Sequence, residues 1–138
     1  MSSARTKARK RALDLLFEAE QRGVNAVTLL DDREVTPVTP APLPAYTGIL
    51  VRGVVGKWHA INEALSTYSQ GWPLDRMPAV DRALLRVAAY ELLYEDDVPD
   101  AVVISEAVGL ATELSTDESP SFINGLLARL AEVKTTLV

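Results

Sequence analysis

The sequence predicts an all-α fold, and three observations support this prediction. Apolar residues recur at steps of three and four through most of the chain, which is the period of an amphipathic helix. No segment keeps the strict apolar–polar alternation of a half-buried strand. Prolines stand between the periodic segments, where helices are expected to end or begin. Together the segments predict about seven helices, five of them clear and up to two short.

The N-terminal half begins with a helix predicted over residues 4–22, for which Gly23 is a suitable stop. Its apolar face comprises Ala8, Ala12, Leu15, Leu16 and Ala19. Residues 24–35 predict a short second helix followed by a loop. Four prolines then make residues 36–44 an extended connection, because proline cannot continue a helix. The next apolar stripe predicts one long helix from Pro44 to about residue 70.

The C-terminal half follows a break at the sequence GWPLDRMP. Residues 79–94 are apolar on most sides and predict a central, buried helix. Residues 101–114 carry an apolar face, with Asp100 a candidate cap. The last helix is predicted over residues 120–134, with Ser119 as the cap residue that precedes a proline in the first turn.

Length and composition indicate one domain. The 138 residues are enough to bury a core, and the first 36 alone are too few, so we expect a single domain over residues 1–138. Within it lie a basic N-terminal segment 1–11 and the proline-rich internal loop 36–44. The absence of cysteine excludes disulfides, thiol catalysis and cysteine-ligated metal.

No run of about 18 apolar residues is present, and no apolar signal core follows the N-terminal charges. The sequence therefore predicts a cytoplasmic protein without a membrane span. Its net charge of −5 argues against binding nucleic acid over the whole surface. Any such binding must be local.

The first candidate site is a basic cluster at the start of the first helix. Five of the fourteen basic residues occupy seven positions, and the rest of the chain carries a net charge of −10. These five are Arg5, Lys7, Arg9, Lys10 and Arg11. Cations at a helix N-terminus oppose the helix dipole, and like charges three or four residues apart repel. Bound phosphate would relieve both penalties, so the cluster predicts an anion site; the alternative is a solvated tail.

The second candidate is a stripe on the central helix. Residues spaced by four share one helix face, and here they are Arg82, Arg86, Tyr90 and Tyr94. Guanidinium and aromatic planes in a strip can bind phosphates and bases. Alternatively, both arginines pair with nearby acids such as Asp81 or Glu91, and the tyrosines pack.

The third candidate is the sequence SPSFINGLL, which opens the last helix. Phe122 lies off the inward face, where it can either stack on an unpaired base or close the edge of the core. Asn124 lies in the same first turn. Gly125 costs about 1 kcal/mol relative to alanine in a helix interior, which predicts that a neighbour approaches the helix backbone closely there.

Signals for an enzyme are weak. His59 is the only histidine, and a packed or exposed role suits it better than a catalytic one. The sequence has no glycine-rich phosphate loop and no HExxH. We therefore expect neither catalysis nor a cofactor.

Three stretches of the sequence carry recognisable motifs: KARKRALDLLF at the N-terminus, YTGILVRGV at residues 46–54, and residues 80–130 with the landmarks LLRVAAYEL, the D-V-P turn, I-x-E-A-V and FINGLL. With these motifs the chain resembles the NusB family of transcription antitermination factors. The resemblance covers most of the chain in the right order. It implies an all-helical fold of two packed helical subdomains and no enzymatic activity.

The resemblance also implies a function. Members bind the boxA element of nascent ribosomal RNA transcripts as a single strand, together with a small ribosomal protein called NusE. The pair joins other Nus factors on RNA polymerase. The RNA contacts implied by position are Arg5, Lys7, Arg9, Tyr68, Arg86, Phe122 and Asn124. Charge and the arginine–tyrosine stripe add Lys10, Arg11 and Arg82.

Two further expectations concern partners. The nearly all-round apolar central helix predicts that the free protein can form a homodimer through the surface it offers to RNA or NusE. The alternative to the RNA-binding function is a helical protein–protein adaptor, in which the basic cluster contacts an acidic partner.

Overall fold

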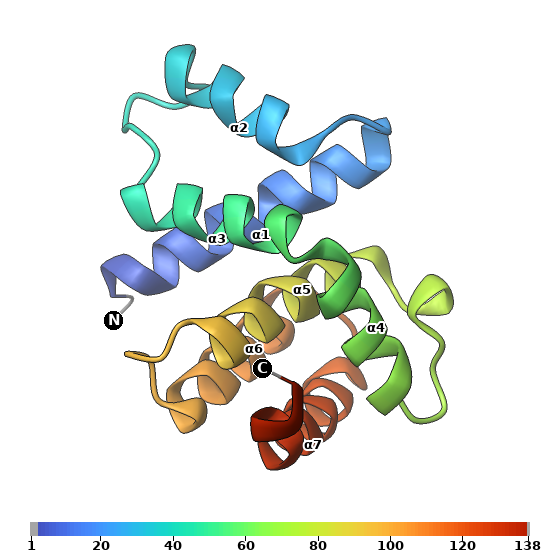
Figure 1. The fold of residues 1–138 in the computed structure, drawn as a ribbon. Helices are drawn as coiled ribbons and strands as arrows, with labels where there is room; N and C mark the ends of the chain where they lie inside the picture. The colour runs from blue at the N-terminus through green and yellow to red at the C-terminus, as the bar shows by residue number, and fades with distance from the viewer. Residues whose placement is uncertain (1–2, 138) are drawn as a thin grey trace.

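The computed structural model describes residues 3–137, which form seven α-helices and no strand (Figure 1). The helices are α1 (Ala4–Arg22), α2 (Ala26–Val35), α3 (Ala45–Gly56), α4 (Trp58–Tyr68), α5 (Ala79–Tyr94), α6 (Asp100–Leu114) and α7 (Ser119–Leu137), with a short 3₁₀ helix η1 (Leu74–Arg76) before α5. The predicted all-α class is confirmed. Residues 1 and 2 of the predicted basic segment, and residue 138, lie outside the described residues.

The first helix has the bounds that its sequence predicts. Ser3 is the N-cap, and its Oγ accepts a hydrogen bond from the backbone N–H of Thr6 at 3.0 Å. Gly23 ends the helix in the left-handed conformation, with φ of 65°, and its N–H bonds back to carbonyls of the last turn. The sequence predicts both ends of α1 correctly because the two capping residues, Ser3 and Gly23, directly flank the helix.

The single long helix predicted from Pro44 to residue 70 is wrong. The chain forms two helices that are separated at Lys57, whose φ of −114° and ψ of 25° lie outside the helical range. The apolar stripe continues across the break, since Val54 and Ile61 are both fully buried. The two helices have different neighbours: α3 packs on α1 and α5, whereas α4 packs on α5 and α7. Packing against different helices thus changes the direction of the chain at Lys57, while the apolar stripe continues from α3 into α4.

Two predicted caps are also wrong. Asp100 lies inside the first turn of α6, where its carboxylate accepts a hydrogen bond from Lys134 Nζ at 2.8 Å. Ser119 is the first residue of α7, and its Oγ donates to Asp81 Oδ2 at 2.7 Å. Both side chains bind a distant helix instead of an adjacent backbone N–H, which sequence alone does not indicate.

The helices form two packed groups, α1–α3 and α4–α7, as the resemblance implies (Figure 1). Helix α5 is central: α1 and α3 cover one side of it, and α4, α6 and α7 cover the rest. A single cluster of buried apolar side chains includes residues from all seven α-helices. None of the described helices is long and apolar enough to cross a membrane.

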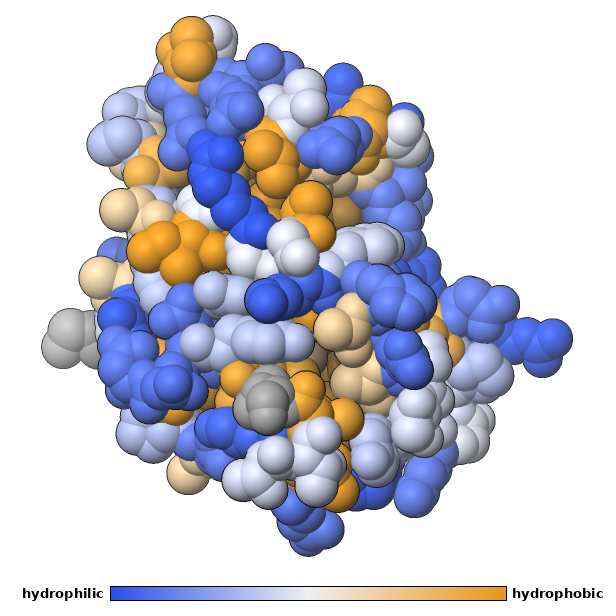
Figure 2. All heavy atoms as spheres, viewed as in Figure 1, coloured by the Kyte–Doolittle hydropathy of each residue, from blue (hydrophilic) through white to orange (hydrophobic). Residues whose placement is uncertain are grey.

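The apolar surface of α5 is covered within the chain itself. Eleven of its sixteen residues are buried. The large apolar side chains that remain exposed lie elsewhere, at Val24, Val35, Val38, Ile49, Trp58 and Val102. Figure 2 shows apolar patches over α2 and α3, broken by hydrophilic side chains. The homodimer therefore stays a prediction, and it has lost its original support, because α5 offers no broad apolar face.

The two groups approach each other closely at Gly53 of α3. The ring of Tyr90 on α5 lies against the Gly53 backbone, and a Cβ added at Gly53 would overlap three of its ring atoms. Gly53 is therefore required by packing, since any side chain would push α3 away from α5.

Gly53→Ala is expected to destabilise the protein by about 1–3 kcal/mol or more, because the added methyl overpacks the contact with Tyr90. Gly109→Ala is the matched control. It lies inside α6 with nothing near the position of an added Cβ, so it should raise stability by about 0.5–1 kcal/mol. Urea unfolding of both variants measures the difference. Equal stability of the two variants would contradict the packing role of Gly53.

Candidate functional site

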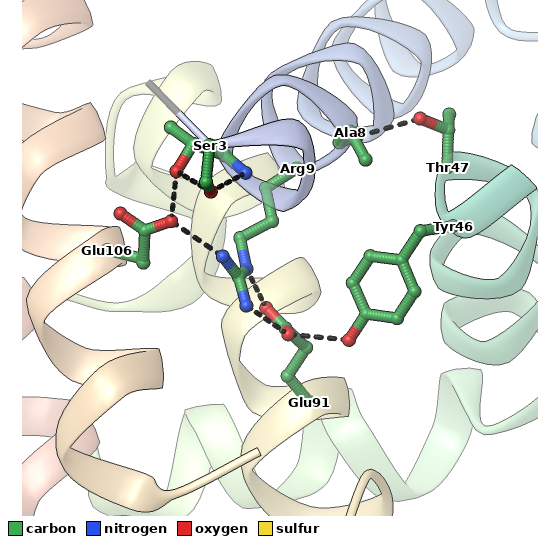
Figure 3. Close-up of polar contacts among 8 residues, drawn as sticks. Ser3, Ala8, Arg9, Tyr46, Thr47, Glu91 and Glu106 are labelled. Atoms are coloured by element: carbon green, nitrogen blue, oxygen red, sulfur yellow. Dashed lines mark hydrogen bonds and ion pairs between the residues drawn. The ribbon is translucent and has the colours of Figure 1, made fainter. Parts of the chain in front are cut away.

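Arg9 is not a surface cation, although the resemblance implies that it contacts RNA. Only 4% of the residue is exposed. Its Nε and Nη2 donate to the two carboxylate oxygens of Glu91 at 2.7 and 2.9 Å, and its Nη1 donates to Glu106 Oε1 at 2.6 Å (Figure 3). In this structure the guanidinium is thus held between α5 and α6 and is not open to a phosphate.

The same network reaches α3. Tyr46 Oη donates to Glu91 Oε2 at 2.7 Å, and Thr6 donates to Glu106 (Figure 3). Burial and the hydrogen bond to Glu91 raise the pKa of Tyr46 well above its ordinary value, so the phenol stays protonated. Burial acts to lower the pKa of Arg9, but the hydrogen bond and charge of Glu91 outweigh it. The Arg9 network therefore joins α1, α3, α5 and α6.

Two of the other N-terminal cations are exposed and weakly engaged. Arg5 lies 4.3 Å from the centre of the Tyr46 ring and 3.5 Å from the Asp97 carboxylate. Lys10 Nζ lies 3.0 Å from Glu113 Oε1, and both side chains face solvent. Solvent screens such pairs strongly, so a more highly charged ligand can replace these partners.

Lys7 and Arg11 have no ion pair with any of residues 3–137. They are spaced by four on α1 and share a face. Lys7 is exposed and Arg11 is half-buried. The predicted basic cluster thus consists of one internal arginine and four cations on the surface.

The two arginines of the predicted stripe share a single carboxylate. Arg82 Nε donates to both oxygens of Glu20 at 2.9 and 3.1 Å, and Arg86 Nη1 donates to Glu20 Oε2 at 2.9 Å. Pairing with an acid was one of the two interpretations of this stripe. The acid, however, comes from α1, and neither Asp81 nor Glu91 serves. Sequence reasoning missed Glu20 because it lies more than sixty residues away.

Arg86 also stacks on an aromatic ring. Its guanidinium carbon lies 4.3 Å from the centre of the Trp58 ring, and its Nε donates to Asn62 Oδ1 at 2.9 Å. Burial lowers the pKa of Arg86, and Glu20 offsets part of this effect. Glu20 and Arg86 line two hollows, of about 880 and 460 Å³, which open on either side of them.

The two tyrosines of the stripe, Tyr90 and Tyr94, do not form an exposed surface together with Arg82 and Arg86. Tyr90 packs on α3 and its Oη donates to Glu95 Oε1 at 2.9 Å. Burial and this bond raise its pKa to about 12. Tyr94 has Lys57 Nζ at 5.1 Å from its ring centre. Both rings therefore have internal partners near the break between α3 and α4.

The start of α7 carries the aromatic part of the candidate site. Phe122 is half-buried, and its ring meets Trp72 edge to face, with 5.0 Å between centres and an angle of 78°. Asn124 is exposed, and Tyr68 is half-buried at the end of α4. Phe122 thus closes the edge of the core and still presents part of its ring to solvent. Trp72, which lines the larger hollow, was missed because its loop has no periodic pattern.

The model of the NusB family matches residues 6–132 of this chain. The chain belongs to the NusB family. Proteins named transcription antitermination protein NusB are similar over nearly their whole length: that of Kineococcus radiotolerans is 59% identical over 135 residues, covering 98% of each chain, and that of Streptomyces coelicolor is 51% identical over 138 residues, covering 98% and 97%. The resemblance inferred from sequence is confirmed.

Solved structures agree with this assignment. T. maritima NusB superposes with a TM-score of 0.82 at 32% identity, covering 96% of this chain and 93% of that one. A structure of the antitermination factors NusB and NusE in complex with dsRNA has a TM-score of 0.81 at 23% identity, covering 96% and 99%. The second likeness shows the fold alone.

Arg9→Met is expected to destabilise this NusB-family chain by about 3–5 kcal/mol, because it leaves Glu91 buried without its counter-charge. Adding Glu91→Leu should recover much of the loss, since the unpaired charge is then removed. Lys10→Met, whose ion pair is exposed, is the control and should change stability far less. Urea unfolding of the three variants tests this, and equal effects at Arg9 and Lys10 would contradict the internal role of Arg9.

Stability should fall in acid through Glu20. Hydrogen bonds from Arg82 and Arg86 hold its pKa below the ordinary value, with burial opposing them. A carboxyl with a lowered folded pKa binds fewer protons when folded, so its contribution is present above the unfolded pKa of about 4.3 and lost as pH falls through the lowered value. Unfolding of Glu20→Gln should therefore depend less on pH between about 5 and 3 than that of the wild type. If the free energies of unfolding of Glu20→Gln and of the wild type changed equally with pH, Glu20 would be excluded as a source of the acid sensitivity.

Proposed function

We propose that this chain is a transcription antitermination factor that binds RNA through the surface cations of α1. The observation that carries the proposal is the pair Lys7 and Arg11, two cations on one helix face that form no ion pair with a carboxylate of residues 3–137. In a chain of net charge −5, such a face is poorly explained by stability. Its relatives are named for transcription antitermination.

Phosphate binding fits the electrostatics of this face. Cations near the N-terminus of α1 oppose the helix dipole and repel one another, and a phosphate chain removes both penalties. Arg5 and Lys10 add to Lys7 and Arg11, since their carboxylate partners are exposed and replaceable. We propose that these four side chains bind phosphates, whereas Arg9 stays paired with Glu91 in the interior.

The remaining proposed contacts lie at the other candidate positions. Phe122 and Tyr68 would stack on bases, and Asn124 would donate or accept hydrogen bonds at a base edge. Arg82 and Arg86 can contact a phosphate only where Glu20 releases them, so we place them second in importance.

The finer proposal concerns the ligand and its partners. We infer that the RNA is a boxA-type single strand of a nascent ribosomal RNA transcript, bound together with a NusE-type ribosomal protein. Other Nus factors and RNA polymerase would complete the assembly. A protein of the same fold has been solved with NusE and dsRNA. The acidic remainder of the chain suits a basic ribosomal protein and keeps RNA binding local.

Titration of a labelled boxA-type strand tests the proposal. With four cations on phosphates, the slope of log affinity against log salt should be about −3, which is roughly a 50-fold loss from 50 to 200 mM salt. Lys7→Gln with Arg11→Gln should reduce the magnitude of the slope by about 1.4. Arg22→Gln with Arg52→Gln removes two exposed cations elsewhere and should leave it nearly unchanged.

The controls separate the proposal from its alternative. An unrelated strand of equal length should bind more weakly than the boxA-type strand, and added NusE-type protein should tighten binding of the latter. Absence of RNA binding, with retained binding of the NusE-type protein, would favour a helical protein–protein adaptor. An unchanged slope in the Lys7 and Arg11 variant would move the phosphate contacts away from α1.

A further inference from the structure

Arg129 of α7 is a half-buried cation that sequence reasoning did not single out. Its Nε donates to the backbone carbonyl of Tyr68 at 3.0 Å. This carbonyl belongs to the last turn of α4, where carbonyls have no partner within the helix. The bond holds the guanidinium between the end of α4 and the surface of α7.

The absence of a side chain at Gly125 leaves space for the guanidinium of Arg129. A Cβ added at Gly125 would lie 3.3 Å from Nη1 of Arg129, which is tighter than ordinary contact. The close neighbour predicted for Gly125 is therefore a side chain one turn later in the same helix. The helix tolerates the low helix propensity of glycine at this position, which leaves room for Arg129 along its surface.

The charge of Arg129 is left unbalanced. Among residues 3–137, no carboxylate lies within ion-pair distance of it, and no hydrogen bond from Nη1 or Nη2 is formed. Arg82 and Arg86, by contrast, share Glu20. A partly desolvated guanidinium without an anion is unfavourable, so an external anion is its natural partner.

The position of Arg129 on α7 indicates which kind of anion would bind to it. Phe122, Gly125 and Arg129 stand at helical spacings of three and four, so they share one face. The seven helical steps from Phe122 to Arg129 span about 10 Å along the axis. The face thus offers a partly exposed ring, then a glycine without a side chain, then two free guanidinium nitrogens.

We propose that Arg129 is a further RNA-binding residue, which holds a backbone phosphate of the strand whose base stacks on Phe122. The guanidinium fork matches two phosphate oxygens, and the bond to Tyr68 fixes its direction before RNA arrives. The inference rests on the proposed RNA-binding function and extends the contact surface from α1 to the middle of α7.

Titrating the boxA-type strand against variants of the full chain tests this. Arg129→Gln should weaken binding roughly tenfold, as expected for a lost hydrogen-bonded charge pair, and reduce the magnitude of the salt slope by about 0.7. Arg129→Lys keeps the charge without the fork, so it should retain the slope and lose part of the affinity. Arg52→Gln removes an exposed cation of α3 and should bind as the wild type does.

Gly125→Ala separates binding from stability. It should weaken RNA binding by displacing the guanidinium, while its greater helix propensity keeps the thermal midpoint at or above that of the wild type. Thermal unfolding of each variant accompanies the titrations. Wild-type affinity and slope in both Arg129→Gln and Gly125→Ala would overturn the inference and leave the proposed function standing. Failure of the wild type to bind RNA would overturn both.

Discussion

The buried pair of Arg9 and Glu91 is the interaction on which the arrangement of the two helical groups depends. Glu91 is 1% exposed in the last turn of α5, and Arg9 reaches it from α1 with two hydrogen bonds. Neither charge can stay in the core alone, because desolvation would cost several kcal/mol per ion. Each therefore fixes the position of the other's helix. Tyr46 and Glu106 extend this constraint to α3 and α6.

This pairing also decides which cations remain for a ligand. Arg9 is taken up by the interior, and Arg82 and Arg86 share the carboxylate of Glu20 near the other end of α1. Four surface cations remain on the first half of α1, and Arg129 lies on α7. An acidic chain can thus carry a small number of directed positive groups, which favours local RNA contact over general attraction.

The glycines show how packing uses the absence of a side chain in two ways. At Gly53 the ring of Tyr90 occupies the space, and the two groups of helices come together. At Gly125 the space is filled by Arg129 of the same helix. The sequence marks both as unusual residues for a helix interior, but it does not say whether the neighbour is a ring or a guanidinium.

The sequence by itself determined the helices and much of their extent. The bounds of α1 and α5 follow from apolar periodicity and adjacent end signals, and the family follows from motifs in the right order. These features depend on residues within a few turns of one another. Only the tertiary structure decided the break at Lys57, the partners of Asp100 and Ser119, and the burial of Arg9. Each of these depends on a group far away in the chain, as Glu91 is for Arg9 and Glu20 is for Arg82. The sequence alone does not show whether an arginine pairs with a distant carboxylate or remains available to a ligand. The packing of the helices decides this, because it determines which carboxylates lie near the arginine.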